Sequence, residues 1–165
     1  MRKYLQIVDR NKASLGTRFA NNIIDTIVLI IINFIISFIS IMIYNFTLLH
    51  FFYFYNNGGF LWDIFTGSIV AFFYFFLWEK LSEGKTPGKY VTGTVVISTD
   101  GQKPTTKQYL SRSLYRIIPF EAFTFFGSDG WHDSMSDTRV IDIKNYEAEK
   151  QTKSDIDSLG NKEIA

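Results

Sequence analysis

The feature that most constrains this chain is an uncharged stretch that runs from Thr26 to Trp62 and contains no Asp, Glu, Lys or Arg. Its first part is rich in Ile, Leu and Phe, and a membrane-spanning helix needs about 20 such residues. Asp25 lies at the edge of this stretch, and a carboxylate at the centre of a spanning helix costs roughly 2.5–3.5 kcal/mol. We therefore expect a spanning helix at about residues 17–45 in which Asp25 has a partner or a function.

A second apolar segment, at about residues 61–80, predicts a second spanning helix with a tryptophan near each end, as is typical of membrane interfaces. Gly67 and Ala71 are four residues apart, and such a small-residue pair predicts a close approach of the first helix. The segment between the helices is rich in aromatic residues and contains the turn signal Asn-Asn-Gly-Gly. Together these features predict a two-helix transmembrane hairpin.

The distribution of basic residues predicts the orientation of this hairpin. Five Lys and Arg residues precede Phe19, seven lie between Lys80 and Arg116, and none lies between the two helices. Basic segments stay on the cytoplasmic side of a membrane. We expect a multi-pass membrane protein whose N-terminus and whose segment after the second helix are cytoplasmic.

Two β-branched stretches, at about residues 90–98 and 138–143, predict short strands. An isolated strand leaves its backbone unpaired, so the two are expected to pair on the same side of the membrane, with an even number of crossings between them. Residues 107–127 lie between them and contain Arg, Glu and Pro119, which favour an interfacial or re-entrant helix. A third span is the alternative.

The predicted fold class is thus a membrane protein, mainly α, with a two-helix transmembrane hairpin, a short cytoplasmic β-sheet and an interfacial or re-entrant third helix. Residues 1–145 form one membrane domain, and residues 146–165 form a flexible charged tail. The chain has no Cys, and its two His are far apart, so we expect no metal site and no cofactor. A net charge of +1 argues against nucleic-acid binding, and no nucleophile–base pair indicates an enzyme.

The polar residues of the first helix form one stripe, which indicates a packing or cavity-facing surface. The candidates for binding an ion or proton are Asp25, Asn22, Thr26 and Asn33. Asn33, with Ser37 and Ser40, serves equally well to hydrogen-bond a neighbouring helix. Arg18 precedes Asp25 by two helical turns and lies on nearly the same face, so an ion pair between them is expected, either structural or functional.

Three sequence clusters stand out, namely Arg18 with Asp25, the segment from Glu83 to Gly93, and the segment from Gly130 to Asp142. Taken together and in this order, they resemble the RDD family of small bacterial membrane proteins. The family is named for an Arg at the start of the first helix, an Asp within it, and a second Asp after the last hydrophobic segment. The resemblance assigns these positions to Arg18, Asp25 and Asp133, since His132-Asp133 matches the later motif and Asp137 stands where the family usually has a small residue. The segment after the second helix also matches, through Gly84, Lys85, Thr86, Gly88 and Lys89.

The resemblance covers about residues 13–143, although the family commonly has a longer third hydrophobic segment. The resemblance implies at most a transport function. Some members of the family are proposed to exchange Na⁺, Li⁺ or K⁺ for H⁺. The first hypothesis is therefore a monovalent cation/proton antiporter component in which Asp25 carries the ion or proton, working as a homo-oligomer in the lipid bilayer. The alternative is a non-enzymatic scaffold or assembly module, with other membrane proteins as partners, in which Arg18, Asp25 and Asp133 are structural.

Two further interpretations concern the later charges. Asp133 is a candidate to pair with Arg112 or Arg116, which are four residues apart and share a helical face, next to His132. The Gly-Lys-Thr-Pro-Gly-Lys segment has the wrong spacing for a phosphate-binding loop, so we expect a turn whose lysines lie at anionic headgroups.

Overall fold

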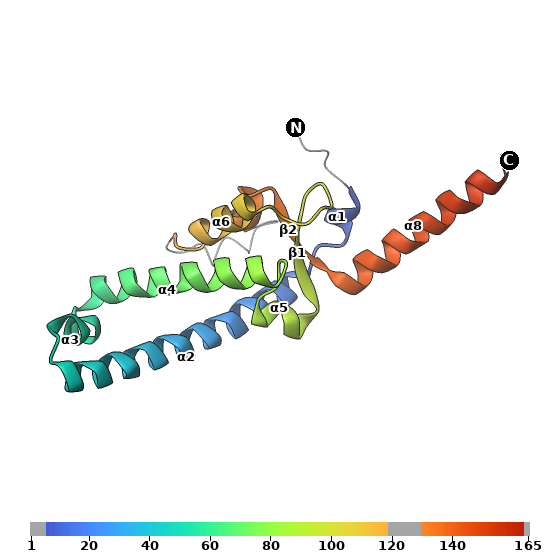
Figure 1. Ribbon diagram of the computed structural model, residues 1–165. Helices are drawn as coiled ribbons and strands as arrows, with labels where there is room; N and C mark the ends of the chain where they lie inside the picture. The colour runs from blue at the N-terminus through green and yellow to red at the C-terminus, as the bar shows by residue number, and fades with distance from the viewer. Residues whose placement is uncertain (1–5, 119–129, 164–165) are drawn as a thin grey trace.

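A computed structural model describes residues 6–118 and 130–163. Its main feature is a hairpin of two long helices, α2 (Leu15–Thr47) and α4 (Phe60–Leu81), joined by the short helix α3 (His50–Asn57). Figure 1 shows α3 at one end of this hairpin and the small elements of the chain gathered at the other. The two predicted apolar helices are therefore present, each within a few residues of its expected bounds.

Both long helices leave their apolar side chains uncovered. Only 6% of the most apolar window of α2 and 11% of that of α4 are buried, whereas the core helix of a soluble protein is mostly buried. At 1.5 Å per residue the 33 residues of α2 extend about 50 Å, well beyond a hydrocarbon core of about 30 Å. The first turns of α2 are thus available to pack against protein instead of lipid.

The predicted strands pair as one antiparallel sheet. β1 (Thr94–Ser98) pairs with β2 (Thr138–Asp142), with Val96 opposite Val140. The expected strand at 90–98 begins later because Thr86 caps a short helix, α5 (Pro87–Thr92), whose first residue is Pro. Gly93, at φ 71°, ends α5 and lets the chain turn into β1.

The small core lies around this sheet. Ala13, Val96 and Val140 form the buried apolar cluster, and the backbone N–H of Ala13 donates to the carbonyl of Val140. The segment after α1 (Gln6–Arg10) lies beside β2 through a bridge between Lys12 and Ile141. The chain entering α2 is therefore anchored on the sheet.

The described part of the third helix is short. α6 (Thr106–Tyr115) begins with a capping box between Thr105 and Gln108, and its ten residues extend about 15 Å, half of what a span requires. Residues 119–129 of the expected 107–127 helix lie outside the described residues. The chain is described again at α7 (Trp131–Ser134), which leads into β2.

Two expectations about packing need correction. Most of the expected flexible tail is helical, since α8 (Ile143–Glu163) projects from β2 away from the hairpin (Figure 1). The predicted close approach at Gly67 is wrong, because a Cβ added there would meet nothing within 4 Å. The tight glycine contact occurs at Gly88 instead, where an added Cβ would lie 2.5 Å from the carbonyl oxygen of Asn21. Thus α5, and not α4 at Gly67, makes the close approach to α2.

We predict that Gly88→Ala destabilises the protein by about 1–3 kcal/mol, because the new methyl group must displace α5 from α2. Thermal or denaturant unfolding of the purified protein in detergent measures this loss. Gly67→Ala is the matched control and is expected to cause no loss. Equal stability of the two variants would show that the α2–α5 contact yields easily.

Candidate functional site

Asp25 is the most buried side chain of α2, with 2% of its surface exposed. Its Oδ1 accepts hydrogen bonds from the Tyr74 hydroxyl at 2.9 Å and from the Gly88 N–H at 2.9 Å, and its Oδ2 accepts one from the Thr86 hydroxyl at 2.6 Å. All three donors are neutral. Among the described residues no basic group lies within ion-pair distance of Asp25, which is unusual for a buried carboxylate.

The expected pair between Arg18 and Asp25 is wrong. The Nη2 of Arg18 lies 2.8 Å from the Oδ2 of Asp133 on α7, and both side chains are buried. Spacing along α2 placed Arg18 and Asp25 on one face, but the start of α5 and Tyr74 of α4 supply the hydrogen-bond donors of Asp25. The two family charges of α2 therefore belong to two adjacent parts of the same site.

Asp133 also pairs with Arg112, as one of the two sequence interpretations expected, and in this contact the Nη1 of Arg112 donates a hydrogen bond to the Oδ1 of Asp133. Burial alone would raise the pKa of Asp133, but His132, Arg112 and Arg18 together lower it. Burial alone would lower the pKa of Arg112, but Glu79 and Asp133 outweigh it and raise the pKa. Both groups therefore stay charged. Asp137 is exposed, in contrast to Asp133.

Glu79 of α4 is a central charged residue of the site that sequence reasoning missed. It is fully buried and lies 2.7 Å from the Nζ of Lys89, 2.9 Å from the Nε of Arg112 and 3.4 Å from the Nη2 of Arg116. Arg116 also stacks over the ring of Phe75 at 4.0 Å. One signal could have identified Glu79. It is the one acid in the second half of α4, and the segment that follows, from Lys80 to Arg116, is rich in basic residues.

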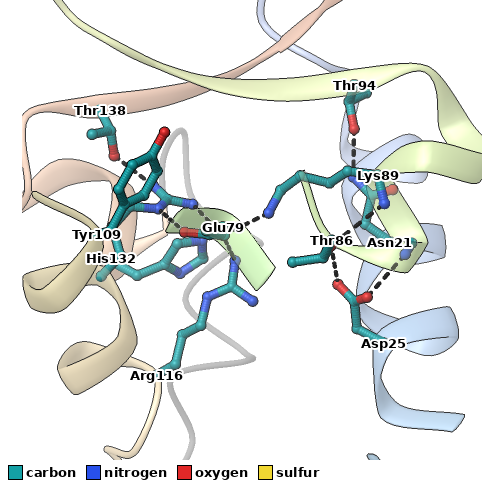
Figure 2. Close-up of polar contacts among 12 residues, drawn as sticks. Asn21, Asp25, Glu79, Thr86, Lys89, Thr94, Tyr109, Arg116, His132 and Thr138 are labelled. Carbon is teal, nitrogen blue, oxygen red and sulfur yellow. Dashed lines mark hydrogen bonds and ion pairs between the residues drawn. The ribbon is translucent and has the colours of Figure 1, made fainter. Parts of the chain in front are cut away.

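Lys89 is a second correction. Its side chain was expected at anionic headgroups, but only 2% of it is exposed, and it reaches from the Asp25 side of the site to Glu79 (Figure 2). Burial lowers the pKa of Lys89 to about 8, an effect that Glu79 offsets only in part. Lys89 is therefore a buried lysine, and not the expected charge at the membrane surface.

The predicted oxygen ligands are only partly brought together. Asn22 lies on the wall of the cavity that Asp25 lines, whereas Thr26 is exposed and donates to Asn22 at 3.4 Å. Asn33 lies two turns further on and donates to the carbonyl of Leu29 in its own helix. The buried amide is that of Asn21, which bonds the Thr92 and Thr94 hydroxyls next to the sheet and was not predicted.

The other polar residues of α2 serve packing. The Ser37 hydroxyl donates to Asn56, and the Ser40 hydroxyl donates to the carbonyl of Phe52 at 3.1 Å, both on α3. For these two serines the structure supports the simpler interpretation, hydrogen bonding between neighbouring helices.

A cavity of about 120 Å³ is lined by residues of both parts of the site, the part around Asp25 and the part around Asp133. Its wall includes Asp25, Asn22, Lys89, Arg116 and Asp133. Within the described ranges no three His, Asp or Glu side chains cluster in a way that could hold a metal ion. The wall combines the carboxylates of Asp25 and Asp133 and the amides of Asn21 and Asn22 with the basic side chains of Arg18, Lys89 and Arg116.

A pair of uncovered apolar helices with a buried ionic cluster at one end defines the chain as a small membrane protein. The model of the RDD family matches residues 12–136, which is most of the sequence, and the chain belongs to this family. Searches among curated proteins and among solved structures found no match.

We predict that Asp133→Asn destabilises the protein by roughly 3–5 kcal/mol, because Arg18 and Arg112 lose their shared counter-charge in a buried place. Unfolding in detergent measures the difference. Asp137→Asn removes the same charge four residues later at an exposed position and is expected to change stability little. If the two variants unfold alike, Asp133 does not hold the cluster together.

Proposed function

We propose that this protein is a multi-pass protein of the bacterial inner membrane that exchanges a monovalent cation for a proton at the cavity beside Asp25. The observation that carries this proposal is a buried carboxylate whose partners are all neutral. Buried charges are usually paired with an opposite charge, and ionisable residues inside membrane segments usually serve function. A positive ion is the partner that Asp25 lacks.

The hydrogen bonds of Asp25 leave room for such an ion. A carboxylate offers about four lone-pair sites. Oδ1 uses two of them, for Tyr74 and Gly88, and Oδ2 uses one, for Thr86. One site on Oδ2 therefore remains for a cation, and Asn22 lies on the wall of the same cavity.

The proposed topology places both ends of the chain in the cytoplasm. It is supported by the absence of Lys and Arg between the two long helices and by the gathering of basic residues at the sheet end of the hairpin. Two helices alone do not enclose a path across a membrane, so we propose that several copies assemble. The partners in this proposal are lipid, protons and monovalent cations, and no covalent chemistry is assigned to the chain.

Single cysteines test the topology cleanly because the native chain has none. We predict that Asn57→Cys on α3 reacts with a membrane-impermeant maleimide in intact cells. Lys103→Cys, before α6, and Lys150→Cys, on α8, should react only after the membrane is permeabilised. All three positions are exposed. Labelling of Lys103→Cys and Lys150→Cys from opposite sides would mean that the chain crosses the membrane between them.

The exchange itself is tested in vesicles that contain the purified protein and a pH-sensitive dye. We predict that a pulse of Na⁺, Li⁺ or K⁺ moves protons, and that Asp25→Asn abolishes this movement because the cation loses its carboxylate. Asp63→Asn is the matched control, since Asp63 is an exposed acid at the other end of the hairpin. Wild type that behaves like empty vesicles would refute the exchange, and Asp25→Asn that moves protons as wild type does would refute the role of Asp25 in it.

A specific observation favours a second candidate, a non-enzymatic scaffold or assembly module. A continuous set of ion pairs joins Arg18 of α2, Asp133 of α7, Arg112 of α6, Glu79 of α4 and Lys89 of α5. Such a set would hold the hairpin on the sheet without transporting anything. In that case Asp25→Asn lowers the unfolding temperature, and no variant moves protons.

A further inference from the structure

Lys89 connects the two parts of the site. Its backbone N–H lies 3.5 Å from the Thr86 hydroxyl oxygen, and that hydroxyl donates to Asp25 at 2.6 Å. Its Nζ points away from Asp25 and lies 2.7 Å from Glu79, as Figure 2 shows. Lys89 also lines the cavity together with Asp25. A change of charge on Lys89 therefore occurs beside the proposed cation site.

Lys89 shares its counter-charge with stronger bases. Glu79 is the common partner of Lys89, Arg112 and Arg116. An arginine in a protein does not lose its proton, whereas a buried lysine does so readily. Of the three cations that compete for this one carboxylate, Lys89 is the one able to become neutral.

We infer that Lys89 holds the proton of the exchange, while Asp25 binds the cation. The inference rests on the proposed function and assigns its two ions to two different side chains. One proton leaves the Lys89 ammonium group as one monovalent cation enters beside Asp25, and the reverse happens when the cation leaves. No covalent bond between heavy atoms forms or breaks.

The charges of the described cluster support the inference that a proton on Lys89 and a cation beside Asp25 exclude each other. With His132 counted as neutral and Lys89 protonated, four cationic side chains face three carboxylates; with Lys89 neutral as well, the two signs balance. The residues are Arg18, Lys89, Arg112 and Arg116 against Asp25, Glu79 and Asp133. Either a proton on Lys89 or a cation in the cavity gives one positive charge, whereas both together give two in a poorly solvated place.

The groups that surround Lys89 come from four elements. They are Glu79 on α4, Arg112 on α6 and Arg116 at its C-terminal end, Arg18 and Asp25 on α2, and His132 and Asp133 on α7; Tyr109 of α6 interacts with Glu79 and Arg112. Burial, with the charge of Glu79, raises the pKa of Tyr109 to about 12, so this phenol stays neutral while Lys89, with a pKa of about 8, titrates. The direction of the Lys89 shift agrees with the role inferred from the geometry.

The test uses Lys89→Met and Lys89→Arg in the full-length protein. Binding of Na⁺ is followed as the rise in unfolding temperature with Na⁺ concentration in detergent, with choline as the inert salt, between pH 6.5 and 9.5. Proton movement is followed in vesicles as above. Glu79 keeps Arg112 and Arg116 as partners in both variants.

In wild type the apparent affinity for Na⁺ should fall about tenfold for each pH unit below about 8, as one-for-one competition with a proton requires, and should level off above it. Lys89→Met should bind Na⁺ with no such dependence and should move no protons. Lys89→Arg, which keeps the charge at every pH, should not bind Na⁺.

Two results would overturn the inference, and they are distinguishable. Lys89→Met that keeps both the pH dependence and the coupled proton movement of wild type would remove Lys89 from the exchange and leave the proposed function intact. Wild type that moves no protons would refute the proposed function, and the role of Lys89 with it. If Lys89→Arg fails to fold, the Lys89→Met comparison alone decides between these results.

Discussion

The structure depends on the side chain of Glu79, because three cations from two other helices meet on this one carboxylate. Lys89 of α5, and Arg112 and Arg116 of α6, are all brought to α4 by it. A buried charge without a counter-charge is strongly unfavourable. Glu79 therefore links α5, which packs on α2, and α6, which packs on α4, through one buried carboxylate.

What could be predicted from the sequence was decided by local patterns. The uncharged stretch from Thr26 to Trp62 indicates its helix without knowledge of any partner, and the β-branched runs indicate two strands that must pair. The start of β1 was predicted too early because Thr86 and Pro87 provide a cap and a first helical residue. That signal is also local, and it was available in the sequence.

The pairing of the charges could not be predicted in the same way. Helical spacing correctly places Arg18 and Asp25 on one face of α2, but it contains no information on what covers that face. The turn at Thr86 and the close contact of Gly88 with Asn21 place the start of α5 against Asp25. The hydrogen-bond donors of Asp25 are therefore neutral groups, and Arg18 is not among them. Arg18 then pairs with Asp133, 115 residues later in the chain. Such choices depend on tertiary packing.

This division of charges bears on how one site could serve both stability and exchange. Asp133 lies between two arginines, which keep their charge throughout the physiological pH range, so these two ion pairs are electrically fixed. Asp25 has only neutral partners, and Lys89 competes with arginines for Glu79, so the charge of the part around Asp25 and Lys89 is able to change. The proposed exchange requires both kinds of group, because the protein would have to stay folded while an ion enters and leaves. The fixed pairs hold the helices together, and the cavity lies where these pairs meet the changeable part.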